Sequence, residues 1–287
     1  MQKQKRVAAI HDISCFGKCS LTVALPILSA AGLEACCIPT AVLSTHTGGF
    51  SGYTYRDLTE DILPVAAHWK SLDIHFDAIY TGFLGSEAQT DIIAEVIKAI
   101  AAPDTLVLID PVMGDNGSLY TVFQNSFPAA MRRLCARGNI IVPNMTEAYL
   151  LLGEAYRPGP YTEAEIQRLL SGLVKLTKGD VVLTGVYFDE TELGAAAKSA
   201  SGGAVEYVLR PRVAGMYHGT GDVYASTLLA AVMRGFSLSE AAGIAADYTV
   251  QSIYTTKEMD KDLRYGVNFE YNLPALMQAL SAKGDLQ

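Results

Sequence analysis

The sequence predicts an α/β protein with a mostly parallel sheet covered by helices, and three observations predict this class. Short apolar runs recur along the 287 residues, longer segments with helical periodicity separate them, and half of the residues are hydrophobic. Strands that are apolar throughout are typical of parallel sheets that are buried on both faces. Because no linker, repeat or low-complexity run is visible, we expect a single domain over residues 1–287.

The elements follow from these patterns in chain order. The predicted strands are the apolar runs Val7–Ile10, Ala35–Pro39, Ala78–Thr81, Leu106–Ile109, Ile140–Val142 and Val181–Thr184. The predicted helices between them are Ser20–Ala31, Glu87–Ala101, Phe127–Ala136 and Glu163–Leu176. In the segment Val186–Arg212, two glycines precede a strand-like stretch, which indicates a hairpin or two added strands. The last helices are expected at Gly221–Arg234, Ser239–Tyr254 and Asn272–Leu280.

Composition narrows the classes of function. A net charge of −8 argues against a nucleic-acid-binding protein, which would normally carry a basic face. We expect no export signal, since the apolar run after the basic start is short, and no membrane span, since no run of 18 apolar residues occurs. The five cysteines form no CxxC pair, so reduced thiols in the cytoplasm are expected.

Ligands of open α/β sheets bind at the carboxyl ends of the strands. The residues after the predicted strands are polar or glycine: His11-Asp12, 45–49, Gly82-Phe83, 110–115, 144–147 and Thr184-Gly185. Two common nucleotide motifs are incomplete. The segment Asp12–Cys19 lacks the first glycine and the final hydroxyl of a P-loop, and Tyr224 breaks the dinucleotide fingerprint GxGxxG.

The segment Gly219-Thr220-Gly221-Asp222 precedes a predicted helix. Its glycines would let the backbone present N–H groups at a helix N-terminus, which is a site for an anion such as a transferring phosphoryl group. Asp222 could then accept the proton of a substrate hydroxyl that attacks phosphorus. The alternative is an ordinary helix cap, with Thr220 as the capping residue.

Two further segments suit a nucleotide and its metal. Asp110 ends an apolar strand and Asp115 lies in a glycine-containing loop, so both could serve a Mg²⁺ ion that carries ATP phosphates, or could simply form two turns. Asn144 and Glu147 begin a helix three residues apart. They could contact Mg²⁺ through water, or form a capping box.

Taken together, these segments resemble the pyridoxal kinase group of the ribokinase-like kinases, from about Val7 to Tyr254. The segments that carry the resemblance are THTGG at 45–49, YTGF at 80–83, DPVMGDNGSLY at 110–120, VPNMTE at 142–147, VVLTG at 181–185 and HGTGD at 218–222. The late GTGD, paired with an earlier DPVMGD, is the most specific part of it.

The resemblance implies a ribokinase-like three-layer αβα sandwich with a mostly parallel central sheet and a lid loop at 112–122. It implies transfer of the ATP γ-phosphoryl group to the 5′-hydroxyl of a vitamin B6 form, with Asp222 as the base. The amides of Gly219, Thr220 and Gly221 would form the anion hole. Family members are commonly homodimers, and often need a monovalent cation such as K⁺.

The same resemblance assigns the nucleotide contacts. Asp110, Asp115 and Glu147 would lie near Mg-ATP, with Asn144 beside them. Asp110 and Glu147 would meet the metal mostly through water. Thr184 would lie near the phosphates, which Thr220 and Gly221 would also contact.

His46 lies in a polar segment after a predicted strand, and residues of this segment could hold the polar edges of a small ring substrate or could simply be loop residues. The resemblance places Thr47 at the polar edge of a pyridine ring, and Phe83 against the ring face. Asp12 stands where many pyridoxal kinases have serine. A carboxylate there could pair with a pyridinium nitrogen or with the amine of pyridoxamine, so we expect it to tilt the preference among vitamers. Phe83 and Val142 replace a usual tyrosine and threonine. The lid lacks a cysteine, so no thiohemiacetal is expected there.

The sequence is also compatible with other functions. A hydroxymethylpyrimidine kinase of the same superfamily would also take a flat heterocycle with a CH₂OH group. A sugar kinase would need more polar groups than the N-terminal half offers. A non-catalytic nucleotide- or vitamin-binding protein could keep the fold without the activity. Turnover of ATP with a panel of these acceptors would discriminate between them.

Overall fold

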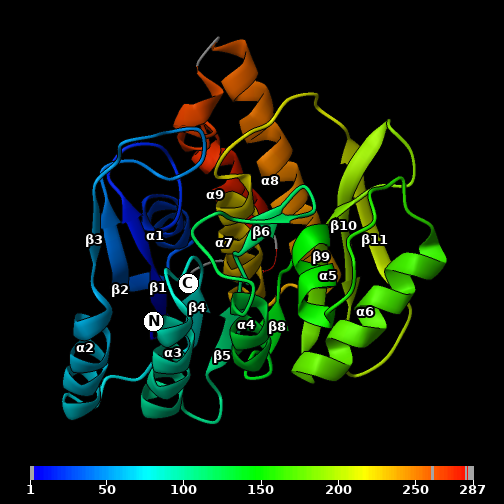
Figure 1. Ribbon diagram of the computed structural model, residues 1–287. Helices are drawn as coiled ribbons and strands as arrows, with labels where there is room; N and C mark the ends of the chain where they lie inside the picture. Colours follow the sequence, from blue (N-terminus) through cyan, green and yellow to red (C-terminus); the bar gives the residue numbers. More distant parts are fainter. Residues whose placement is uncertain (1–2, 260–261, 282, 284–287) are drawn as a thin grey trace. The chain divides into compact units, whose positions relative to one another are not determined.

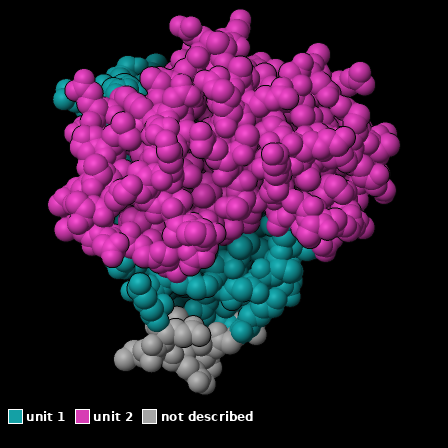
Figure 2. All heavy atoms as spheres, turned by 90° about the horizontal axis from the view of Figure 1, so that it is seen from below, with its two compact units in different colours: residues 1–58, 213–287 teal, residues 59–212 magenta. Residues whose placement is uncertain are grey.

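The computed structural model describes residues 3–259, 262–281 and 283 (Figure 1). These residues fall into two compact units (Figure 2). Unit 1 comprises residues from 1–58 and 213–287, and unit 2 comprises residues 59–212. The predicted α/β class with a mostly parallel central sheet is confirmed. The expectation of a single domain stays a prediction. In the part of the chain that the structure describes, no helix has the length and apolar character that crossing a membrane requires.

Unit 1 contains three strands in the order β1-β2-β3, of which β1 and β2 are parallel and β3 runs antiparallel to β2. The strands are β1 (Arg6–Ser14), β2 (Glu34–Leu43) and β3 (Tyr55–Asp57). The helices are α1 (Leu21–Ala30), α7 (Thr220–Met233), α8 (Leu238–Glu258) and α9 (Leu273–Ser281), with 3₁₀ turns η1 (Leu263–Tyr265) and η2 (Glu270–Asn272).

Strand β1 is longer than its apolar run predicts. It continues past Ile10 to Ser14, and its pairing with β2 is irregular between His11 and Ile13. Asp12 therefore lies inside the strand at this irregularity, and the expectation that it follows the strand end is wrong. A bulge of this kind re-aims side chains and is common next to active sites.

Helix α7 is buried almost all round. Its apolar residues, among them Ala225, Leu228 and Leu229, are fully buried, and it packs against both α1 and α8. A helix that is hydrophobic on every face is stable only inside a core. The core of unit 1 thereby fixes the N-terminal end of α7, which carries Gly219 and Asp222.

Unit 2 has the strand order β11-β10-β9-β8-β5-β4, with parallel pairing from β4 to β9 and an antiparallel hairpin beyond it. Its strands are β4 (Ala78–Thr81), β5 (Leu106–Ile109), β8 (Ile140–Ile141), β9 (Asp180–Val186), β10 (Glu192–Lys198) and β11 (Glu206–Pro211), and the two-residue strands β6 (Gly114–Asp115) and β7 (Ser118–Leu119) form a separate small hairpin. Its helices are α2 (Thr59–Ser71), α3 (Glu87–Ile100), α4 (Phe127–Cys135), α5 (Met145–Leu152) and α6 (Glu163–Thr177). The hairpin predicted after Val186 is confirmed as β10 and β11.

Local sequence explains how these helices begin and what they bury. Ser86 caps α3 by accepting the backbone N–H of Gln89, and a stripe of Ile93, Val96 and Ile100 is buried at helical spacing. Strand β4 is buried along its whole length, as a central parallel strand should be.

The close approach of β10 to β11 at Gly194 can be tested by adding a methyl group there. A Cβ atom at Gly194 would lie 1.9 Å from the carbonyl oxygen of Val208, whereas one at Gly172 in α6 would meet only the flexible end of Leu152. We expect Gly194→Ala to destabilise the protein by about 1–3 kcal/mol, since backbone must move. Gly172→Ala should change stability by less than about 1 kcal/mol, since alanine favours a helix. Urea unfolding of both variants measures the difference, and equal losses would contradict the packing.

Candidate active site

The N-terminus of α7 presents an uncapped first turn. Gly219 is the N-cap residue, with φ +78°, and no side chain caps the helix. Thr220 donates its hydroxyl to the carbonyl of Tyr217 at 3.1 Å, so the alternative in which Thr220 caps the helix is wrong. Gly221 is exposed, and a Cβ atom there would meet nothing within 4 Å. The turn therefore has accessible backbone N–H groups at the positive end of a helix dipole, as anion binding requires.

Asp222 lies in this first turn and is half-buried. Burial raises the pKa of its carboxyl to about 7, a backbone N–H bond from Ser20 lowers it, and the charge of Asp12 raises it further. A carboxyl that titrates near neutrality suits a general base, because it is ionised often enough to act and basic enough to take a proton.

Asp12 is a second carboxylate of the same site. It is buried, and the hydroxyl of Ser14 donates a hydrogen bond to its Oδ2 at 3.0 Å. Burial raises its pKa, while bonds from Ser20 and Ser14 lower it. Burial raises the pKa of the Cys19 thiol, and the charges of Asp222 and Asp12 raise it further. Because both carboxyl groups act on the same thiol, the structure brings the two predicted aspartates together in unit 1.

The backbone around Lys18 holds this site in place. A Cβ atom at Gly219 would lie 2.0 Å from the Lys18 carbonyl oxygen, and one at Gly266 would lie 2.9 Å from it. The Lys18 N–H donates to the carbonyl of Tyr265 at 3.2 Å, and its ammonium contacts Glu270 at 2.6 Å. Only glycine allows chain segments to approach so closely.

His46 connects the predicted substrate loop to two other segments of unit 1. Its Nδ1 accepts the backbone N–H of Gly48 at 3.1 Å, and its Nε2 lies 2.6 Å from the carbonyl oxygen of Arg264. Its ring lies 5.1 Å from that of His218. Burial lowers the pKa of His46, and the Gly48 bond fits a neutral ring with its proton on Nε2. Thr47, the neighbouring candidate, is exposed.

In unit 2, the start of α5 is a full capping box. The Asn144 side chain accepts the N–H of Glu147, and Glu147 Oε2 accepts the N–H of Asn144, each at 2.9 Å. The capping-box alternative is thus confirmed. The cap is compatible with a metal role for Glu147, because the carboxylate oxygens keep further lone pairs.

The same residues hold the predicted lid. Glu147 Oε1 accepts the N–H of Met113 at 3.0 Å, and Asn144 Nδ2 donates to the carbonyl of Gly114 at 2.9 Å. Thr146 accepts the N–H of Gly117 at 2.9 Å. Sequence reasoning missed the part that Thr146 plays, although its place between Asn144 and Glu147 in one motif was the available signal. These hydrogen bonds attach the lid, with its hairpin β6–β7, to the N-terminus of α5.

Two carboxyl groups of unit 2 are close to one buried thiol. Asp110 and Glu147 are both buried, and the charges of both help burial to raise the pKa of Cys135. Burial also raises the pKa of Glu147, against the lowering effect of its backbone N–H bonds. Buried carboxylates of this kind are suited to a cation that restores their charge balance. Within residues 3–259, 262–281 and 283, no three His, Cys, Asp or Glu side chains gather as a metal site by themselves.

The other candidates of unit 2 have separate surroundings. Asp115 is exposed and accepts the N–H of Asn116 at 2.8 Å. Thr184 lies beside Asn144 through a parallel backbone bridge, and its N–H donates to the carbonyl of Pro143 at 2.9 Å. Asn144, Glu147 and Thr184 are thus brought together. Phe83 is half-buried, with its ring 5.6 Å from that of Phe123.

The sequence profile of the phosphomethylpyrimidine kinase family matches residues 25–266. The chain belongs to this family. It is a small-molecule kinase, and the resemblance to pyridoxal kinases of the ribokinase-like superfamily is confirmed.

Three relatives illustrate the likeness. A protein of Bacteroides thetaiotaomicron, provisionally named a phosphomethylpyrimidine kinase, is 39% identical, and its crystal structure with pyridoxal matches 96% of each chain with a TM-score of 0.91. The pyridoxal kinase of Lactobacillus plantarum is 31% identical over 97% of this chain and 99% of its own, with a TM-score of 0.89. The pyridoxine/pyridoxal/pyridoxamine kinase of Bordetella avium is 27% identical over 88% of this chain and 86% of its own.

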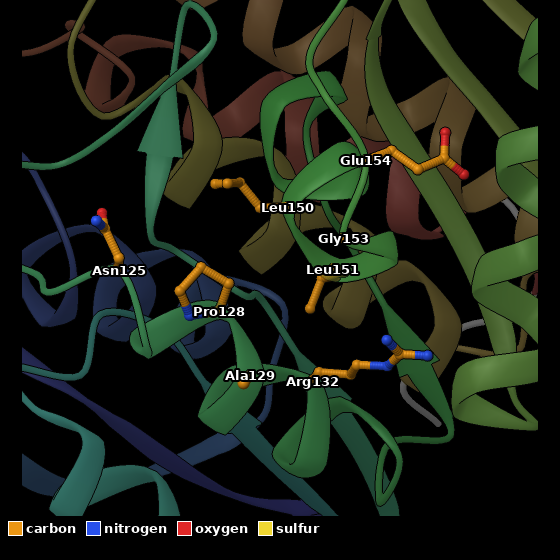
Figure 3. A pocket seen from close by; sticks show the side chains of 8 residues that line it. All are labelled: Asn125, Pro128, Ala129, Arg132, Leu150, Leu151, Gly153 and Glu154. Atoms are coloured by element: carbon orange, nitrogen blue, oxygen red, sulfur yellow. The ribbon is translucent and has the colours of Figure 1, made fainter.

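A separate hollow of about 330 Å³ lies in unit 2 of this kinase (Figure 3). Its lining comes from α4 and the turn before it, and from the end of α5: Asn125, Pro128, Ala129, Arg132, Leu150, Leu151, Gly153 and Glu154. None of the predicted site residues lines it, so we assign it no part in the reaction.

The hydrogen bonds between α5 and the lid can be tested at Asn144. Asn144→Ala removes both the cap and the bond to Gly114, so we expect a loss of about 1–2 kcal/mol in unfolding free energy and faster hydrogen exchange at residues 113–119. Asn144→Ser is the matched control. It keeps a capping hydroxyl but cannot reach Gly114, so it should restore most of the stability and leave the lid exchange fast. Wild-type exchange in the serine variant would show that Asn144 does not hold the lid.

Proposed function

We propose that the chain transfers the γ-phosphoryl group of ATP to the 5′-hydroxyl of pyridoxal, pyridoxamine or pyridoxine. The observation that carries the proposal is Asp222, whose carboxyl has a pKa of about 7 and lies in the uncapped first turn of α7. The names of the relatives support the substrate class, because two of the three are vitamin B6 kinases and the third has been crystallised with pyridoxal.

On this proposal, Asp222 accepts the proton of the 5′-hydroxyl while that oxygen bonds to the γ-phosphorus and the bond between phosphorus and the ADP oxygen breaks. The N–H groups of Gly219, Thr220 and Gly221 stabilise the charge on the transferring phosphoryl group, because they lie at a helix N-terminus that no side chain caps. The products are the phosphate ester and ADP.

The nucleotide contacts are proposed for unit 2. Asn144 and Thr184 would contact the phosphates, and Asp115 would serve from the lid. Asp110 and Glu147 would hold Mg²⁺, mostly through water. That ion would offset the charge of the phosphates when bound. The burial of these two carboxyls supports a cation there, because a charged ligand would reverse the cost of their desolvation.

The acceptor contacts are proposed for Asp12, Thr47 and Phe83. Thr47 would bind the polar edge of the ring, and Phe83 would lie against its face. His46 already uses both ring nitrogens within unit 1, which supports a part in holding the Thr47 loop. A K⁺ requirement and a homodimer are further proposals that rest on the family resemblance, and a cytoplasmic location is a proposal that rests on the cysteines, which form no CxxC pair. Activity with and without KCl, and sedimentation, measure the first two.

A hydroxymethylpyrimidine kinase is the second candidate, and the name of the matching family favours it. The pyridoxal in the Bacteroides thetaiotaomicron structure favours vitamin B6 instead. We expect ATP-dependent turnover of at least one B6 vitamer at kcat/KM tenfold or more above that of hydroxymethylpyrimidine. Coupled detection of ADP across pyridoxal, pyridoxamine, pyridoxine, hydroxymethylpyrimidine and ribose decides the question. The reverse order would assign the pyrimidine activity.

The proposed base can be tested by removal. Asp222→Ala should lower kcat by roughly 10²- to 10⁴-fold, because proton transfer loses its acceptor while the helix and its amides stay in place. Thermal unfolding serves as the control, and it should show a folded protein, since removing a half-buried carboxyl with a raised pKa leaves no charge unpaired. Near-normal turnover would contradict the assignment.

The pH dependence follows from the same carboxyl. Asp222 must be ionised to act, so kcat/KM should fall about tenfold per pH unit below pH about 7. The ATP phosphates also titrate, and Asp12→Asn separates the two effects. The Asp12 charge raises the pKa of Asp222. Loss of that charge in Asp12→Asn should therefore move the fall of kcat/KM at acid pH (the acid limb) to lower pH, while the titration of ATP stays the same. An unmoved limb would assign the titration to another group.

A further inference from the structure

Ser20 has a backbone conformation that serine rarely adopts. Its φ is +56° and its ψ is −129°, in a region that favours glycine, although the residue is buried and lies at the N-cap of α1. Non-glycine residues in such conformations persist only where the surroundings enforce them, and they cluster at functional sites. The conformation of Ser20 therefore points to a constraint imposed by its surroundings.

The Ser20 side chain also does not do what a serine at this position normally does. An N-cap serine usually accepts a backbone N–H of the first turn, but the Ser20 hydroxyl makes no such bond. A backbone bridge sets Ser20 antiparallel to Ile13 of β1, between Asp12 and Ser14. The hydroxyl bonds to the Asp12 carboxylate instead.

The Ser20 backbone has a second partner. Its N–H bonds to the Asp222 carboxylate at the start of α7, so one residue contacts both carboxyl groups. Its carbonyl still accepts the N–H groups of Val23 and Ala24, at 3.0 and 2.9 Å, and so starts α1. The unusual φ and ψ allow the carbonyl to face the helix while the N–H and the hydroxyl face the two aspartates.

We infer that Ser20 is a positioning residue that connects the two aspartates: its N–H orients Asp222, and its hydroxyl holds the Asp12 carboxylate by a hydrogen bond. The effect on the pH dependence of kcat/KM rests on the proposed function, whereas the effect on the pKa of Asp222 does not. Through Asp12, the Ser20 hydroxyl sets the pH range in which Asp222 is a base.

The other titratable groups around the pair do not compete for this role. Cys19 faces both aspartates, and burial with their charges raises the pKa of its thiol well above the usual value. Tyr55 of β3 faces Asp12, and burial with neighbouring charges raises its pKa to about 12. Both groups are neutral near pH 7. Of these four groups, Asp222 is the one whose pKa is raised to about 7.

The test compares Ser20→Ala with Ser20→Gly. Both lack the hydroxyl and keep the N–H, so Asp12 should become protonated more readily and repel the Asp222 charge less. The acid limb of kcat/KM should move to lower pH by about half a unit or more in both variants. Glycine also adopts the Ser20 conformation without strain, so its melting temperature should exceed that of the alanine variant. Ser20→Gly is thus the variant to use if Ser20→Ala does not fold.

Two controls make the result decisive. In an Asp12→Asn background, Ser20→Ala should cause no further shift of the limb, because the hydroxyl acts through the Asp12 charge. Carboxyl ¹³C NMR titration of Asp222 should show the same lowered pKa without any assay, so a protein that lacks the proposed activity can still support or overturn the inference. An unchanged Asp222 titration in both Ser20 variants, or a shift that persists in the Asp12→Asn background, would overturn it.

Discussion

The desolvation of carboxyl groups is the constraint on which both parts of the candidate site depend. Burial raises the pKa of Asp12 and Asp222 in unit 1 and that of Glu147 in unit 2. A buried carboxylate is stable only when donors or a cation replace its lost water. The donors that the chain supplies, such as the Ser14 hydroxyl and the Met113 N–H, are neutral. The charge balance therefore leaves room for a cation that arrives with a ligand.

This constraint links the fold to the proposed chemistry. In unit 2, the N–H groups that bond to Glu147 belong to the lid and to the start of α5, so the conformation of the lid and the charge of that carboxyl are coupled. In unit 1, the buried core around α7 prevents the helix from moving to relieve the repulsion between Asp12 and Asp222. Rigid packing thus keeps Asp222 basic enough to accept a proton near neutral pH.

The sequence could predict the class of fold, the buried strands and the segments that carry the site, because apolar runs and glycine motifs are local signals. It did not reveal β3, whose three residues are all exposed, or α2, which contains Pro64 and buries only Ile62 and Ala66 among its described side chains. The irregularity that places Asp12 inside β1 depends on pairing with β2, and the conformation of Ser20 depends on contacts with residues far along the chain. Such features arise from tertiary structure, which no local pattern encodes.

The tight approach of Gly219 and Gly266 to the carbonyl of Lys18 has a consequence for how acceptor preference could diverge among relatives. Three distant stretches of chain share one small volume there, so an insertion or a larger residue in any of them would displace the segment that carries Asp222. The loop that bears Thr47, an exposed residue, does not carry that restriction. Drift or redesign toward a differently shaped alcohol is therefore expected to proceed through that loop, while the Lys18 junction stays constant.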